Sequence, residues 1–183
     1  TFGTALFGDN VRIAGPNAAV GVNDIVFWMG QENFYMFDGR IQPIPCSVRD
    51  FVFSSINKNQ SFKIFAGSLA SQNEVWWFYP SANSEENDRY VIFNYAENLW
   101  YYGTLDRTCW NDRATGQRSF PQATGTDGYL YNHESGLDAD GEAMESYVES
   151  SDFDIGDGDQ FMLIRRILPD LSFRSSTAAN PEV

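Results

Sequence analysis

Short runs of apolar and aromatic residues alternate along this chain with turns rich in glycine, asparagine and aspartate. Residues 24–30 (DIVFWMG) and 33–37 (NFYMF) are followed by the pair Asp38-Gly39 and then by a third run at residues 40–44. Runs of strand length that are joined by such tight-turn pairs are typical of antiparallel hairpins. This part of the sequence therefore predicts a β-meander.

The same pattern recurs in the middle of the chain. Residues 74–79 (EVWWFY) and 89–95 (RYVIFNY) are expected to pair across a polar loop at 81–88, and a turn at 96–98 leads into a further strand at 99–105. Rows of aromatic side chains on successive strands suit stacked, twisted sheets, because each ring fills a large volume at a small cost in side-chain entropy. We expect a second meander with its aromatic residues packed between sheets.

The segments around these meanders are less regular. Further strands are predicted at 62–66, 129–132, 143–149 and 161–169, whereas residues 48–56 are compatible with either a short helical turn or a strand. Helical periodicity is not sustained over any longer window. The chain is therefore expected to consist mainly of strands.

Three phrases, NFYMFDG, RYVIFNY and GYLYNHE, can be aligned on a polar turn residue, which is Asp38, Asn94 and Asn132 respectively. These positions are about 56 and 38 residues apart, near the length of one four-stranded propeller blade. We therefore predict an all-β fold of antiparallel β-meanders that form part of a β-propeller. Residues 1–183 are expected to be one all-β domain or a fragment of a larger propeller protein.

Composition and charge disfavour some classes of function. The chain is 43% hydrophobic and 16% aromatic, as expected for a folded protein, and its formal net charge is −13. This acidic balance disfavours a phosphate-binding surface, which needs clustered lysines and arginines. The sequence has no apolar run long enough to cross a bilayer and no charged-then-apolar leader pattern. Specific nucleic-acid binding and membrane insertion are therefore not expected.

The residues that could carry catalysis are few. His133 is the single histidine, so a histidine-dependent catalytic set would have to use it, but its place at the end of a strand favours a turn residue bonded to backbone. Cys46 and Cys109 are too far apart in sequence to form a paired metal motif. No catalytic residue, cofactor or metal is predicted.

Two acidic clusters lie in glycine-rich turns. In LDADGEAM, the residues Asp138, Asp140 and Glu142 are spaced like calcium ligands, but Ala143 stands where an EF-hand needs glycine. The second cluster, DFDIGDGDQF, matches the calcium-binding nonapeptide repeat only in part. Its acids are Asp152, Asp154, Asp157 and Asp159. A bound ion is one interpretation of either cluster, and a turn-forming role is the favoured one.

Three residues are candidates for a subunit interface. Arg165 and Arg166 lie in FMLIRRILPD, a predicted strand in which neighbouring side chains face opposite ways. One arginine would then face solvent or a neighbouring subunit, and the other could pair with a carboxylate such as Asp170. Trp110 is the third candidate, because large aromatic faces supply anchors between subunits.

A family resemblance covers residues 24–173. It lies in the order of the phrases NEVWWFYP, NDRYVIFNYAENLWYYGTLDRTCW, DGYLYNHESGLDADG and SSDFDIGDGDQFMLIRRILPDLSF. In this order the chain resembles the tail nozzle or packaged-DNA stabilisation proteins of short-tailed phages, which close the head after genome packaging. The resemblance implies a non-enzymatic virion protein of the propeller type, assembled in the host cytoplasm.

The same resemblance implies the partners. The chain would form a homo-oligomeric ring, expected to be a hexamer, below the portal and adaptor and beside other tail proteins. The ring would help to retain packaged DNA and form the channel for its exit, so DNA would pass without specific binding. An acidic chain suits this role, because like charges lower adhesion.

Two other functions remain open at this point. A carbohydrate-active propeller enzyme would use two acids among Asp138, Asp140, Glu142 and Asp154. A glycan- or receptor-binding module of the virion would expose aromatic residues on loops such as 81–88, and that loop has none.

Overall fold

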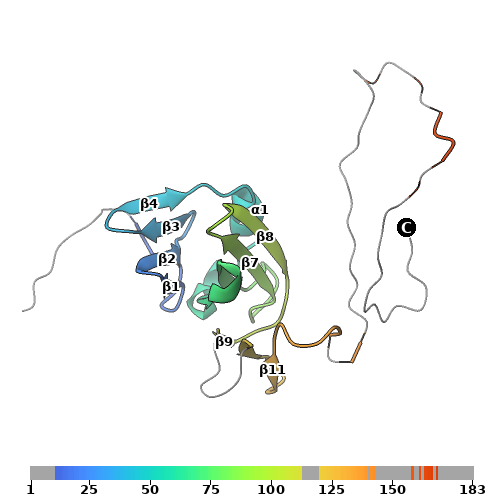
Figure 1. The fold of residues 1–183 in the computed structure, drawn as a ribbon. Coiled ribbons are helices and arrows are strands. Elements are labelled where there is room, and N and C mark those ends of the chain that lie inside the picture. The colour runs from blue at the N-terminus through green and yellow to red at the C-terminus, as the bar shows by residue number, and fades with distance from the viewer. Residues whose placement is uncertain are drawn as a thin grey trace, which may run out of the picture. The chain divides into compact units, whose positions relative to one another are not determined.

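The computed structural model describes residues 11–112, 120–139, 141–142, 158, 161, 163–166 and 168. The chain divides into two compact units, Thr1–Glu134 and Ser135–Val183. The named strands and helices all lie in the first unit, where Figure 1 shows them in chain order from blue to orange. No helix in the described part of the chain has the length and apolar character needed to cross a membrane.

The first sheet is a four-stranded antiparallel meander. Its strands pair in the order β1 (Ala19–Val22), β2 (Ile25–Met29), β3 (Phe34–Phe37) and β4 (Ile41–Ile44). The turn from β3 to β4 is built as predicted, with Gly39 at a φ of 111° and Asp38 Oδ1 accepting a hydrogen bond from the Arg40 amide at 3.3 Å. The predicted meander is confirmed, and β1 is a strand that the sequence pattern did not predict.

Two short helices connect the first sheet to the second. They are α1 (Arg49–Ser54) and the 3-10 helix η1 (Lys58–Lys63), so residues 48–56 adopt the helical alternative. The side chain of Asn57 caps η1 by accepting a hydrogen bond from the Asn59 amide at 3.1 Å. Because η1 includes Phe62 and Lys63, the strand predicted at 62–66 is misplaced.

The second sheet is also a four-stranded antiparallel meander. Its elements are β5 (Phe65–Leu69), the 3-10 turn η2 (Ala70–Gln72), β6 (Glu74–Tyr79), β7 (Arg89–Asn94) and β8 (Leu99–Thr104), with the strands paired in chain order. Asn73 and Asn98, in the turns that precede β6 and β8, adopt left-handed φ values of 60° and 57°. The meander predicted for this part of the sequence is confirmed.

The third sheet has three short strands. They are β9 (Cys109–Asn111), β10 (Gln122–Thr124) and β11 (Leu130–Asn132), with β10 in the centre. Only β11 corresponds to a predicted strand. The strand predicted at 143–149 lies outside the described residues, and the one predicted at 161–169 is wrong at the positions described there, which adopt no strand.

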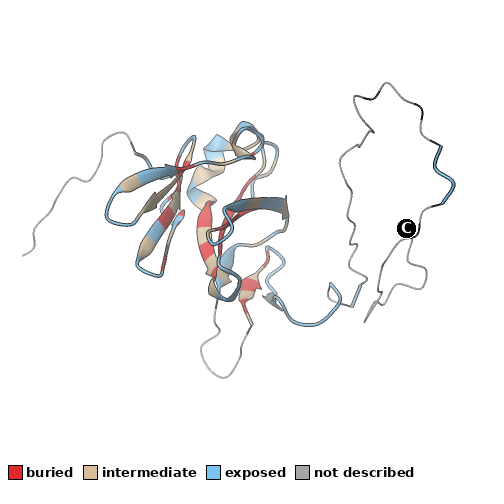
Figure 2. Ribbon diagram, turned by 45° about the horizontal axis from the view of Figure 1, so that its top comes forward, coloured by how far each residue is buried: buried red, intermediate tan, exposed pale blue. Residues whose placement is uncertain are grey.

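The middle sheet carries apolar side chains on both faces. Val75, Trp77 and Tyr79 are fully buried in one hydrophobic cluster with Phe27 and Phe34 of the first sheet. Trp76 and Phe78, which point to the opposite face of β6, belong to a second cluster, which Trp110 of the third sheet joins. Figure 2 shows the resulting concentration of buried residues on strands inside this unit.

The first strands of the three sheets are neighbours in space. Beside β1, the Ala66 amide of β5 donates to the Asn17 carbonyl at 2.8 Å, and on the other side Trp110 of β9 donates through Nε1 to the Ser68 carbonyl at 2.8 Å. These strands begin at Ala19, Phe65 and Cys109, about 45 residues apart. The all-β prediction is therefore confirmed; no described sheet closes on itself, and a propeller stays a prediction.

Candidate functional site

Trp110, an interface candidate from the sequence, lies in an aromatic stack within the first unit. Its ring centroid is 5.0 Å from that of Trp76, 5.7 Å from that of Phe78 and 5.0 Å from that of His133. The indole is half-buried, and its Nε1–H, the only hydrogen-bond donor of the side chain, donates to the Ser68 carbonyl. All of these contacts are with residues of the same chain, and a contact of Trp110 with another subunit stays a prediction.

Arg165 and Arg166 lie in the second unit. Both are exposed, and neither is in a strand. The expectation that their side chains face opposite ways, which assumed a strand, is therefore not supported. Asp170, the expected partner, lies outside the described residues. An interface role for the two arginines stays a prediction.

The acidic turns are described only in part. Asp138 Oδ1 accepts a hydrogen bond from the Gly141 amide at 3.2 Å, which is a turn contact. Asp140 and all four acids of the second cluster lie outside the described residues. Where the structure describes the chain, no three His, Cys, Asp or Glu side chains come together as a metal site would require.

His133 has a partner that the sequence did not indicate. Its Nε2 accepts a hydrogen bond from Arg107 Nε at 2.9 Å, and the Arg107 guanidinium lies 4.3 Å from the centre of the Tyr131 ring. Burial, together with the charge of Arg107, lowers the pKa of His133 to about 4. The imidazole is therefore neutral at pH 7, as an acceptor from arginine must be.

Glu74 is a buried carboxylate at the start of β6. Its Oε2 accepts a hydrogen bond from Trp76 Nε1 at 2.9 Å, because side chains two apart on a strand share a face. Burial raises the pKa of Glu74, and the nearby charge of Glu134 raises it further. Burial also raises the pKa of Tyr90, and the charge of Glu74 adds to this effect. In the sequence, the position of Glu74 at the start of a run of aromatic residues was the signal that could have identified this buried carboxylate.

A surface of exposed aromatic and aliphatic side chains follows the outer strand of the middle sheet. We call it the β8 edge surface; its members, with their exposed fractions, are Tyr102 (53%), Leu99 (48%), Phe51 (45%) and Tyr101 (42%). The Phe51 and Tyr102 ring centroids are 4.6 Å apart, and the Arg89 guanidinium lies 5.6 Å from the Phe51 ring centre. This is a layered arrangement of one cation and two rings.

The backbone of β8 is available along one side. Within the described residues β8 pairs with β7 alone, so its other edge carries unpaired amides and carbonyls. Edge strands are commonly blunted by charged residues, proline or short length, but β8 has six residues, LWYYGT, and no charge. An exposed, uncharged edge of this kind is suited to pairing with another polypeptide.

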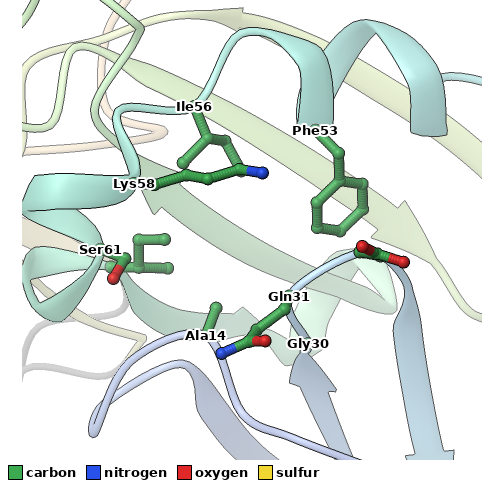
Figure 3. Close-up of a pocket in the computed structure, with 9 residues that line it drawn as sticks. Ala14, Gly30, Gln31, Phe53, Ile56, Lys58 and Ser61 are labelled. Atoms are coloured by element: carbon green, nitrogen blue, oxygen red, sulfur yellow. The ribbon is translucent and has the colours of Figure 1, made fainter.

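A pocket of about 210 Å³ lies between the turn that joins β2 to β3 and the segment that contains α1 and η1. Figure 3 shows Gln31 reaching in from one side, Ile56 and Lys58 from the opposite side, and Phe53 at one end. Ile64 contributes a buried aliphatic wall. The pocket thus brings apolar and polar side chains together, and its exposed lining is more polar than apolar.

No family model matches this sequence, and no curated protein is significantly similar to it. The class of protein that the structure defines is an all-β protein of consecutive, stacked antiparallel meanders.

Proposed function

We propose that the chain is a structural subunit of a phage tail or head-to-tail connector, and that copies of it associate through the β8 edge surface to form a ring. The observation that carries this proposal is the exposed, uncharged edge of β8 beside Leu99, Tyr101 and Tyr102. An apolar edge left in water is an aggregation hazard unless a partner covers it. A second copy is the partner that the resemblance to ring-forming nozzle proteins favours.

The stacking of the sheets supports a propeller as the subunit fold. Consecutive meanders pack face to face, their first strands adjoin, and these strands recur about every 45 residues, the length of one blade. The aligned phrases of the sequence fall on β3, β7 and β11, the third strand of each sheet. Their unequal spacing arises partly from the 81–88 loop, which lengthens the connection between β6 and β7.

The use of the aromatic residues also supports a structural role. Trp76 and Trp77 lie on opposite faces of β6 and are buried in the two separate clusters between sheets. Side chains used in this way stabilise layers and are not presented to a substrate. The net charge of −13 fits a channel that DNA passes without adhering.

A glycan-binding module is the second candidate, because Phe51 and Tyr102 form an exposed stacked pair on the surface. Rings exposed in this manner could also receive the apolar face of a sugar. The loop proposed from the sequence for that purpose, 81–88, has no aromatic residue. The carbohydrate-active enzyme also stays a prediction, since two of its four candidate acids, Asp140 and Asp154, lie outside the described residues.

The test is the native mass and shape of the purified protein. Light scattering after size-exclusion chromatography should give a multiple of the 20.7 kDa chain, and negative-stain images should contain axially symmetric rings. A monomer at every concentration would contradict association through β8. A monomer that binds bacterial surface glycans without cleaving them would favour the binding module, and release of reducing sugar would favour the enzyme.

A further inference from the structure

The pocket between the β2–β3 turn and the α1–η1 segment has a composition that its role in packing does not explain. Ala14, Phe53, Ile56 and Ile64 contribute aliphatic and aromatic side chains to a lining whose exposed surface is more polar than apolar. Ligand sites in proteins are typically apolar hollows with a few convergent polar groups. This pocket has one cation, Lys58, and one anion, Glu32, together with the amide of Gln31.

The two charged side chains are not used by the fold. Both are exposed, and neither forms an ion pair with any residue that the structure describes. The neighbouring cations differ in this respect, because Lys63 pairs with Glu86 and Arg49 pairs with Asp50. The Lys58 ammonium and the Glu32 carboxylate therefore line the same pocket without a direct ion pair between them.

We propose that this pocket binds a small zwitterion whose ammonium and carboxylate are separated by a short aliphatic chain, as in an ω-amino acid. The ligand carboxylate would lie at Lys58 and Gln31, and its ammonium at Glu32. The aliphatic chain would cover Ile56 and Ile64 and remove apolar surface from water. This inference goes beyond the proposed assembly function and does not depend on it.

Several features of the pocket favour an ω-amino acid over a wholly apolar ligand or a simple anion. A wholly apolar ligand would contact neither charge, and a simple anion would use Lys58 and Gln31 but not Glu32. A volume of about 210 Å³ suits a ligand portion of a few heavy atoms. For a ligand of ~9 heavy atoms the expected dissociation constant is on the order of 1 mM.

The experiment is a titration of the full chain, labelled with ¹⁵N, with 6-aminohexanoate, followed by two-dimensional NMR. We expect saturable shifts of the amides of Gln31, Lys58 and Ser61, whose residues line the pocket. Hexanoate and hexylamine, which carry one charge each, should bind about tenfold more weakly. α-Amino acids such as valine should also bind more weakly, because their two charges are adjacent.

The variants Lys58→Met and Glu32→Gln should each reduce the affinity for 6-aminohexanoate about tenfold without loss of folding, because both side chains are exposed. Matched controls are Arg40→Met, an exposed cation in the β3–β4 turn outside this pocket, and Glu97→Gln, in the turn before β8. Linear, non-saturating shifts, shifts at other residues, or equal binding of hexanoate would overturn the proposal. The oligomeric state of the protein is read separately and does not affect these outcomes.

Discussion

Gly67 lies directly under the Trp110 indole, and a Cβ atom at residue 67 would be 2.5 Å from Cδ1 and 2.8 Å from Cγ of that ring. The contact joins β5 of the second sheet to β9 of the third. It is closer than any packed side chain tolerates, so the absence of a side chain at Gly67 allows the third sheet to approach.

Gly67→Ala should therefore destabilise the protein by about 1–3 kcal/mol, because Trp110 must leave the stack that it forms with Trp76. Urea unfolding followed by tryptophan fluorescence measures this change. Gly21→Ala in β1 is the matched control, since nothing lies within 4 Å of its added Cβ. Equal stability of both variants would mean that the third sheet does not pack on β5 in this way.

The buried carboxylate of Glu74 predicts a gain in stability on removal of its charge. Because burial raises the pKa of Glu74 in the folded state, folding favours the protonated form, and the ionised form weakens the folded state. Glu74→Gln keeps an acceptor for Trp76 Nε1 and should stabilise the protein at pH 7 by about 1 kcal/mol.

The sign of the Glu74 effect can be checked with pH. The loss of folding stability caused by ionised Glu74 should grow as pH rises through the unfolded pKa of 4.5 toward the raised folded value. The gain in stability from Glu74→Gln should therefore shrink below pH 4.5. Urea unfolding at pH 7 and pH 4 measures both, with the exposed Glu97→Gln as control. A variant that is less stable at pH 7 would show that the hydrogen bond from Trp76 outweighs the burial of the charge.

His133 gives the opposite dependence on pH. Its pKa falls from 6.5 to about 4 on folding, so the folded state resists protonation, and the stability that this supplies is complete above pH 6.5 and is lost as pH falls toward about 4. Because His133 is the single histidine, its ring resonances can be assigned in the spectrum without mutagenesis. An NMR titration should give a midpoint near 4, and a midpoint near 6.5 would contradict the Arg107 contact.

How far the sequence predicted the fold depended on the length of each element. The predicted limits of β6 match the observed strand, because Glu74 and the five apolar and aromatic residues after it lie between the left-handed Asn73 and Pro80. β9 and β10 have three residues each, too few for an alternating pattern. The strand near residue 62 was misplaced because a local side-chain cap at Asn57 starts a 3-10 helix there.

The candidate surface could not be predicted for a different reason. Trp100 and Tyr101 are adjacent aromatic residues, yet Trp100 packs on Phe34 and Phe93, whereas Tyr101 is 42% exposed. The difference depends on which face of β8 another sheet covers, which is a tertiary property. Likewise, Phe51 and Tyr102 meet only because α1 packs beside the second sheet.

The last prediction concerns the β8 edge surface. The double variant Tyr101→Ser and Tyr102→Ser removes two exposed rings, one from each face of β8, since neighbours on a strand point to opposite sides. Loss of two interface aromatics should weaken association at least tenfold, because such residues carry much of the binding energy. Sedimentation velocity over a range of concentrations measures the shift toward monomer.

Tyr129→Ser is the matched control, because Tyr129 is 69% exposed but lies next to β11, outside the β8 edge surface. Urea unfolding of the double variant must stay close to that of the unaltered chain, since exposed substitutions rarely change stability by more than about 0.5 kcal/mol. If the double variant still assembles while Tyr129→Ser dissociates, the subunit contact lies on the third sheet instead. Assembly that survives in both variants would remove β8 from the interface and leave Arg165 and Arg166 as the next residues to substitute.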